Sequence, residues 1–256
     1  MSRQIRDALS ELMDAVPRHG KRFQRLLNHL RDSQPDAGDP FQLMAFLMAR
    51  GPESKSQLFQ DLWALWVSGQ KRGGFFVEFG ATDGVNLSNT WLLEKTMGWQ
   101  GILAEPNPGF HEALQANRAC ALSTKCVYSE SGLQLEFLAA RKGELSRIAS
   151  IGLADGHDGV ARIARRTLLV ETISLNDLLV EQRAPERIDY LSVDTEGSEL
   201  EILKAFDFDR WDVRAITVEH NYTPARDEIH GLLSQHGFQR QLEDLSLYDD
   251  WYVKVE

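Results

Sequence analysis

The chain has 256 residues, 43% of them hydrophobic, and a formal net charge of −10 at pH 7. This length can bury one large core, and the acidic balance excludes the basic surface that a nucleic acid or an anionic membrane would require. No apolar run near the start approaches the roughly 18 residues that span a bilayer, so we expect a cytoplasmic protein without a membrane partner. The spacing of Cys120 and Cys126 fits neither a redox pair nor a zinc knuckle, and we interpret both as reduced structural residues.

Residues 1–70 are predicted to form a helical leader. Apolar residues recur at helical spacing in four segments, 5–16, 23–30, 41–49 and 56–67. A glycine-containing hinge, Lys71-Arg72-Gly73-Gly74, then leads into a predicted domain over residues 71–256. The leader could cap an active site, form the contact of a homodimer, or cover one edge of a sheet.

From Phe75 the pattern alternates between strands and helices. We predict strands over 75–79, 102–104, 133–138, 167–173, 188–194 and 213–218, and helices over 89–97, 110–117, 174–179, 197–206 and 225–236. Residues 238–242 and 251–255 follow with no predicted helix between them, which indicates a terminal antiparallel pair. Alternating elements imply an α/β fold whose mostly parallel sheet is covered on both faces, and the closing hairpin suits a class I methyltransferase better than a dehydrogenase.

The turn after the first of these strands has the features of a nucleotide-binding site. Glu78 lies at the end of an apolar run, and Gly80 and Gly84 let the backbone bend and approach a ligand without Cβ atoms. A second short strand ends at Glu105, which follows Gly84 by about 20 residues, the spacing at which such a unit presents an acid to a ribose diol.

Two alternatives to a methyltransferase remain at this point. A dinucleotide fingerprint opening at Gly80 would need glycines where the chain has Thr82 and Val85, which disfavours an NAD-type Rossmann oxidoreductase. The form acid-x-Gly-x-Gly-x-Gly is partly kept, with Thr82 at the middle glycine. The second alternative is a non-catalytic module that keeps the cofactor pocket but has lost turnover.

Three motifs in this order resemble those of the FkbM-type S-adenosylmethionine-dependent methyltransferases. They are Phe76-Val77-Glu78-Phe79-Gly80-Ala81-Thr82-Asp83-Gly84 with Ser88-Asn89-Thr90, then Gly98-Trp99 with Gly101-Ile102-Leu103-Ala104-Glu105-Pro106, and Ile188-Asp189-Tyr190-Leu191-Ser192-Val193-Asp194-Thr195-Glu196-Gly197-Ser198-Glu199. The resemblance runs from about Ser56 to the C-terminal hairpin. It implies a Rossmann-like, mostly parallel seven-stranded sheet, S-adenosylmethionine as cofactor, and mainly O-methyl transfer to sugars, glycans or natural products.

The chemistry of the cofactor assigns roles to the motif residues. S-adenosylmethionine carries an ammonium, a carboxylate, a sulfonium and a ribose diol, so its site needs both backbone N–H donors and carboxylates. We expect Glu105 to accept both ribose hydroxyls, Glu78 to orient the turn, and Ser88 and Asn89 to act either as helix caps or as cofactor contacts. The expected cofactor-binding residues are Glu78, Gly80, Ala81, Asp83, Gly84, Ser88, Asn89, Glu105, Pro106 and Asp194.

Asp194 is the expected catalytic residue, because it follows a strand beside the point where the sheet order reverses; Glu196 comes next. O-methylation requires removal of a proton from a weakly acidic hydroxyl. In one route His220 is the general base. In the other, Asp194 and Glu219, with His220 or Asn221 nearby, hold Mg²⁺ or another divalent cation as a Lewis acid, by analogy with catechol-type O-methyltransferases. The acids could instead be a helix start favoured by the helix dipole.

The arginine-rich segment 141–166 is the candidate for acceptor recognition. Its arginines would suit a phosphorylated, carboxylated or nucleotide-linked sugar. A surface loop whose arginines balance nearby acids is the alternative.

Overall fold

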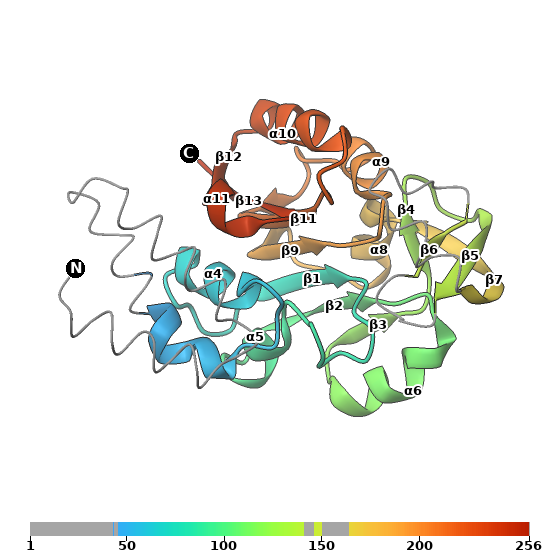
Figure 1. Cartoon of the computed structure of the whole chain (residues 1–256), viewed down its shortest axis with the longest axis horizontal. Coiled ribbons are helices and arrows are strands. Elements are labelled where there is room, and N and C mark those ends of the chain that lie inside the picture. The colour runs from blue at the N-terminus through green and yellow to red at the C-terminus, as the bar shows by residue number, and fades with distance from the viewer. Residues whose placement is uncertain (1–42, 44–45, 141–145, 150–163, 256) are drawn as a thin grey trace.

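The computed structural model describes residues 43, 46–140, 146–149 and 164–255. A seven-stranded sheet of order β12-β13-β11-β9-β1-β2-β3 crosses the centre of the molecule (Figure 1). Its parallel strands are β1 (Phe75–Phe79), β2 (Gln100–Ala104), β3 (Ala121–Ser123), β9 (Tyr190–Val193) and β11 (Ala215–Glu219). β13 (Asp249–Lys254) pairs antiparallel with both β11 and β12 (Phe238–Gln241). The predicted mostly parallel sheet with a terminal antiparallel pair is confirmed.

Both faces of this sheet are covered, which explains why its strands read as continuous apolar runs. Phe76 of β1 belongs to a core cluster with α4 (Gln60–Val67) and α5 (Trp91–Lys95). Its neighbour Val77 belongs to a second cluster on the opposite face. The helices of that face are α8 (Leu175–Glu181), α9 (Glu199–Lys204) and α10 (Ala225–Gln235).

The order of the strands reverses at β1. The chain runs from β1 through α5 to β2 and through α6 (Pro108–Asn117) to β3, so these strands follow one another on one side of β1. β9 and β11 then add on the other side. Open α/β sheets bind ligands beyond the carboxyl ends of the strands at such a reversal. We therefore expect a ligand site at this edge of the sheet.

A second sheet of order β4-β7-β5-β6 lies beyond the arrowheads of β1 and β2 (Figure 1). It consists of β4 (Cys126–Tyr128), β5 (Gln134–Ala140), β6 (Arg147–Ile148) and β7 (Ala164–Ser174). The strands predicted over 133–138 and 167–173 are confirmed as β5 and β7. The pairing of β4 with β7 was not predicted, because strands of two or three residues are too short to show alternation. Two further short strands, β8 (Arg187–Ile188) and β10 (Asp212–Val213), pair with each other.

The helix predicted over 56–67 begins later, at Gln60, after the short 3-10 helix η2 (Gly51–Glu53). The hydroxyls of Ser54 and Ser56 donate to the buried carboxylate of Asp61 at 2.6 and 2.8 Å, which folds the preceding segment around that side chain. Residues 46–50 are helical, as expected, whereas the helices predicted over 5–16 and 23–30 lie outside the described residues. The division of the chain at residue 70 stays a prediction.

Other helix boundaries differ from the expectation by a few residues. α5 begins at Trp91 rather than at residue 89, and the side chain of Ser174 accepts the Asp177 N–H as the predicted cap of α8. A four-residue helix, α11 (Glu243–Ser246), stands between β12 and β13 where none was expected. Leu242, the residue directly before α11, has a left-handed backbone with φ +51°, which turns the chain at the start of this helix. Among the described helices, none combines the length and the apolar character of a membrane span.

Candidate active site

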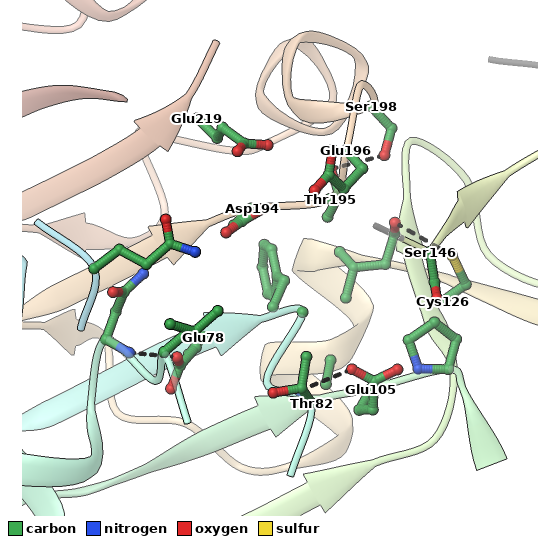
Figure 2. Close-up of a pocket in the computed structure, with 18 of the residues that line it drawn as sticks. Glu78, Thr82, Glu105, Cys126, Ser146, Asp194, Thr195, Glu196, Ser198 and Glu219 are labelled. Atoms are coloured by element: carbon green, nitrogen blue, oxygen red, sulfur yellow. Dashed lines mark hydrogen bonds between the residues drawn. The ribbon is translucent and has the colours of Figure 1, made fainter. Parts of the chain in front are cut away.

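A cavity of about 260 Å³ lies beyond the carboxyl ends of β1, β2, β9 and β11 (Figure 2). Each strand delivers residues to it at its end: Phe79 and Gly80 from β1, Ala104 and Glu105 from β2, Asp194 from β9, and Glu219 from β11. The cavity therefore occupies the reversal of the sheet order, as expected for a ligand site in this architecture.

Glu78 organises the turn that follows β1. Its buried carboxylate accepts the Ser88 hydroxyl at 3.0 Å, the Asn89 N–H at 2.7 Å and the Thr90 hydroxyl. Burial raises the pKa of Glu78, while the Arg118 guanidinium, 3.8 Å away, and these donors counteract the rise. Because its oxygens are occupied by the loop, Glu78 orients the turn, in the role expected from the sequence.

Gly80 lies in close contact with the end of β9. Its φ is +67°, and a Cβ built on it would stand 2.5 Å from the carbonyl oxygen of Asp194, a fixed backbone atom. Thr82, at the position of the middle glycine of the motif, has φ +44° and so keeps the glycine-like backbone. Its N–H donates to Glu105 at 2.9 Å. The altered motif thus retains the shape of the turn and its contact with β2.

The substitution Gly80→Ala is expected to destabilise the fold by about 2–4 kcal/mol, because overpacking adds to the cost of the left-handed backbone. Thermal unfolding should show a decrease in Tm on the order of 5–10 °C. Gly73→Ala is the matched control, since Gly73 has the same φ of +67° and open space around it. Equal decreases in the two variants would contradict the close contact with Asp194.

The remaining residues of the turn shape it from outside the cavity. Asp83 accepts the N–H groups of Val85 and Asn86 at 2.9 and 2.8 Å. The Ser88 hydroxyl accepts the Trp91 N–H at 3.1 Å, which supports the helix-cap interpretation. Of the expected cofactor-binding residues, Glu78, Gly80, Asn89, Glu105, Pro106 and Asp194 line the cavity, whereas Ala81, Asp83, Gly84 and Ser88 do not.

Arg118 holds the turn after β1 in place through hydrogen bonds, and no pattern in the sequence indicated this role. It is buried, and its guanidinium donates to the Gly84 carbonyl at 3.1 Å, to the Thr90 hydroxyl at 2.9 Å and to Glu94 at 2.5 Å. A Cβ on Gly84 would lie 2.6 Å from Arg118 Cγ, so the glycine accommodates this side chain rather than a ligand. No motif marks Arg118, since it follows α6 without any recognisable spacing.

Glu105 is buried at the end of β2 and is held by two backbone N–H groups. Its two oxygens accept the N–H groups of Thr82 at 2.9 Å and Asn107 at 2.8 Å, and each oxygen keeps further lone-pair capacity. Only 3% of the residue is exposed, and this burial raises its pKa to about 7, although both N–H donors lower it. Figure 2 shows Glu105 and Thr82 together at one border of the cavity.

An apolar region adjoins Glu105. Val127 of β4, Phe137 of β5 and Ile148 of β6 line the cavity, together with Cys126 and Ser146. These residues come from the second sheet, which the sequence did not reveal, so this end of the site was missed. Much of segment 141–166 lies outside the described residues; of its described part, Ser146 and Ile148 line the cavity and Arg147 does not.

Asp194, Glu196 and Glu219 gather at the opposite end of the cavity (Figure 2). One carboxylate oxygen from each lies within 4.8 Å of the others. Burial raises the pKa of Asp194 and of Glu219 well above the ordinary range, and repulsion from the neighbouring carboxylates adds to the shift. Glu199 does not belong to this group: it accepts the N–H groups of Thr195 and Gly197 at the start of α9.

His220 does not line the cavity, although it follows directly on Glu219. Its Nδ1 accepts the Tyr222 N–H at 3.0 Å, and its Nε2 faces Asp250 at 3.6 Å. Burial lowers the pKa of this imidazole, so it stays neutral at pH 7. The structure therefore separates His220 from the acids with which it was expected to act, because the chain turns its ring toward β13.

The last wall of the cavity joins α4 to the C-terminal hairpin. Gln60 donates to Asp249 at 2.7 Å, and the Tyr248 hydroxyl donates to Gln57. With Asn221, these four side chains form what we call the hairpin wall. Burial raises the pKa of Asp249 to about 7. No sequence motif revealed the hairpin wall, since its partners lie at opposite ends of the described chain.

A comparison with protein families identifies the family to which this chain belongs. The family model described as the methyltransferase FkbM domain matches residues 78–240. The chain belongs to the FkbM methyltransferase family. The match confirms the resemblance found in the sequence motifs and, with the observed sheet order, the class I methyltransferase fold.

The similar proteins match different shares of this chain, and the matched curated relative shares less than a third of its own length with it. Methyltransferase sdnD from Sordaria araneosa is 38% identical over 78 residues, which are 27% of this chain and 30% of that relative. The solved structure of a methyltransferase FkbM from Methylobacillus flagellatus KT has 14% identity and a TM-score of 0.45, and the match covers 95% of this chain and 60% of that one. A precorrin-6y C5,15-methyltransferase from Geobacter metallireducens GS-15 has 14% identity, a TM-score of 0.39 and 71% coverage of both chains.

Proposed function

We propose that this FkbM-family protein is an S-adenosylmethionine-dependent O-methyltransferase that methylates a hydroxyl group of a sugar, a glycan or a natural product. The observation that carries the proposal is Glu105, a buried carboxylate with two backbone N–H partners beside the glycine turn. The family membership supports the same activity.

The lining residues fit the parts of this cofactor. Glu105 would accept the ribose hydroxyls, and Val127, Phe137 and Ile148 would cover the adenine ring, whose contacts the sequence did not indicate. Gly80 and Asn89, with Asp194, would surround the methionine end. When bound, S-adenosylmethionine supplies an electrophilic methyl group, and the protein has to hold the acceptor oxygen in line with it.

Removal of the acceptor proton falls to the acids at the other end of the cavity. Methyl transfer would form a bond from the acceptor oxygen to the methyl carbon at the expense of the carbon–sulfur bond, and the hydroxyl proton would have to leave. Asp194 and Glu219 lie close together and have raised pKa values, so an ionised member of the pair would take this proton better than an ordinary carboxylate. We assign the pair, rather than His220, as the base, with Glu196 beside it.

A divalent cation is the second candidate role for these acids. Oxygens on opposite sides of Mg²⁺ are about 4.2 Å apart, and around Ca²⁺ up to about 5 Å, so the observed separations within 4.8 Å suit Ca²⁺ and need a small closure for Mg²⁺. Such an ion would lower the pKa of the acceptor hydroxyl. Calorimetric titration with each ion, and activity after treatment with a chelator, test this role. The cytoplasmic location and a homodimer stay predictions.

Calorimetric titration with S-adenosylmethionine, S-adenosylhomocysteine and NAD tests the proposed function. Binding of the two adenosyl compounds in the micromolar range, without binding of NAD, is the expected result. Binding of NAD alone would instead support an oxidoreductase. If the adenosyl compounds bind but no acceptor is ever methylated, the protein is the non-catalytic module.

A further inference from the structure

The charged residues lining the cavity are all of one sign. Within the described part of the chain, every Asp, Glu, Lys, Arg or His side chain that lines it is a carboxylate, so no lysine, arginine or histidine takes part. The carboxylates are Glu78, Glu105, Asp194, Glu196, Glu219 and Asp249. An anionic ligand would lose its hydration there without meeting a compensating charge.

The cofactor accounts for only part of this negative charge. Glu78 is occupied by the loop and lies 3.8 Å from the Arg118 guanidinium, and Glu105 is the ribose ligand of the proposed function. Four carboxylates remain at the other end, and burial raises the pKa of Asp194, Glu219 and Asp249, so these groups are not all ionised near neutral pH. In either protonation state they exchange hydrogen bonds with hydroxyls or amines, whereas no described lining residue supplies a positive charge to an anionic acceptor.

Two buried polar atoms of the lining have no hydrogen-bond partner and favour a ligand that carries hydroxyl or amine groups. Asn89 Oδ1 and Glu219 Oε2 are buried without a hydrogen-bond partner, and both residues line the cavity. Asn89 is only 6% exposed. Asn89 Oδ1 is an acceptor, and the Glu219 carboxyl accepts when ionised and donates when protonated, so hydroxyl or amine groups of a ligand can satisfy both atoms.

The hairpin wall adds groups that accept or exchange hydrogen bonds. Asp249 is held by Gln60 through one oxygen, Oδ2, and it lies beside Tyr248 and Asn221 in the lining. Amides, a phenol and a carboxylate are the groups that recognise the hydroxyls of a polyol. Their mutual hydrogen bonds hold them in place before a ligand arrives.

We propose that the acceptor is a polyhydroxylated molecule that is uncharged or carries an amine, not a phosphorylated or carboxylated one, and that Asp249 and Tyr248 of the hairpin wall select it. This inference rests on the proposed function, because it assigns the other half of the cavity to the cofactor. It differs from the expectation that arginines of segment 141–166 bind an anionic sugar, an expectation that lies mostly outside the described residues. Within the described residues, Arg147 is absent from the lining and Arg166 is exposed on β7.

Saturation-transfer NMR on the complex with S-adenosylhomocysteine tests the selection. The probes are methyl glucoside, glucosamine, glucose 6-phosphate and glucuronate, which differ mainly in charge. We expect methyl glucoside and glucosamine to bind at least tenfold more tightly than the two anions. Asp249→Asn, which keeps the shape of the side chain, should weaken glucosamine binding about tenfold, and Tyr248→Phe should weaken both favoured probes.

Glu243→Gln is the matched control, since Glu243 is an exposed acid of the same hairpin and does not line the cavity. Its probe affinities should equal those of the unchanged protein. Equal or tighter binding of either anion, or no binding of any probe, would overturn the proposal. Because S-adenosylhomocysteine binding is measured first, failure of the proposed function would be seen separately, as the absence of that complex.

Discussion

Replacement of Glu105 by glutamine should weaken the binding of S-adenosylmethionine and S-adenosylhomocysteine on the order of a hundredfold. The amide cannot accept two hydroxyls, and its NH₂ group would face the N–H of Thr82 or Asn107. Losing about 3 kcal/mol from two charge-assisted hydrogen bonds corresponds to that factor. Calorimetry on the variant measures it. Glu112→Gln, an exposed acid on α6, is the control that should bind normally.

The same residue should make cofactor binding depend on pH. Its pKa of about 7 means that the free protein holds a proton on Glu105 below neutral pH, whereas a diol requires the ionised form. Affinity should rise up to tenfold per pH unit as the pH increases toward 7, and level off above it. Since folding raises this pKa, the contribution of Glu105 to the free energy of unfolding falls as the pH rises from 4.5 to about 7.

The affinity for the cofactor and its dependence on pH should change together in this variant. Glu105→Gln should lose the steep dependence on pH together with the affinity, because it has no proton to release. A variant that binds weakly but keeps the original pH profile would show that another group titrates. Thermal unfolding at pH 7 should show that the variant is folded, so that lost affinity reflects the site.

Asp194→Asn and Glu219→Gln should each lower kcat about 10²- to 10⁴-fold on any hydroxyl acceptor that the unchanged protein methylates. Each change removes one member of the pair that takes the proton. The double variant should be scarcely slower than the single ones, since both act on one proton transfer. In Glu219→Gln, whose side chain is not among those proposed to surround the cofactor, S-adenosylhomocysteine affinity, measured by calorimetry, should change less than tenfold.

Glu201→Gln serves as the control for these variants, because Glu201 is an exposed acid on α9. Its kcat should be unchanged. If the single variants of the pair keep their kcat within threefold, the assignment of the base is wrong. If activity instead disappears with a chelator and returns with Mg²⁺ or Ca²⁺, the acids act as cation ligands.

Much of the part of the cavity that is proposed to bind the cofactor could be predicted, because its residues form hydrogen bonds with residues close to them in the sequence. Glu78 bonds to residues 88–90, and Glu105 bonds to Asn107 and back to the turn at Thr82. Such contacts arise from a single strand, turn and helix, and a motif records them. Asp194 was expected only at a strand end beside the reversal of the sheet order, and the structure places its carbonyl close to Gly80 at the end of the neighbouring strand.

The other half could not be predicted, because long-range contacts build it. Gln60 meets Asp249 across 189 positions, and no local pattern in either segment indicates the other. The position of His220 at a strand end favoured a catalytic base, but position alone does not fix the direction of the ring. In the structure the ring faces Asp250 on the neighbouring strand, at 3.6 Å. The second sheet was missed because β4 and β6 carry too few residues to show a period.

The hairpin wall also determines when the site can be completed during synthesis. The residues proposed to hold the ribose and adenine all leave the ribosome by Ile148, while Tyr248 and Asp249 emerge about a hundred residues later. At about 5–20 residues per second, that interval lasts at least several seconds. For this time the nascent chain lacks Tyr248 and Asp249, so the part of the cavity proposed to select the acceptor is the last part of the site to form.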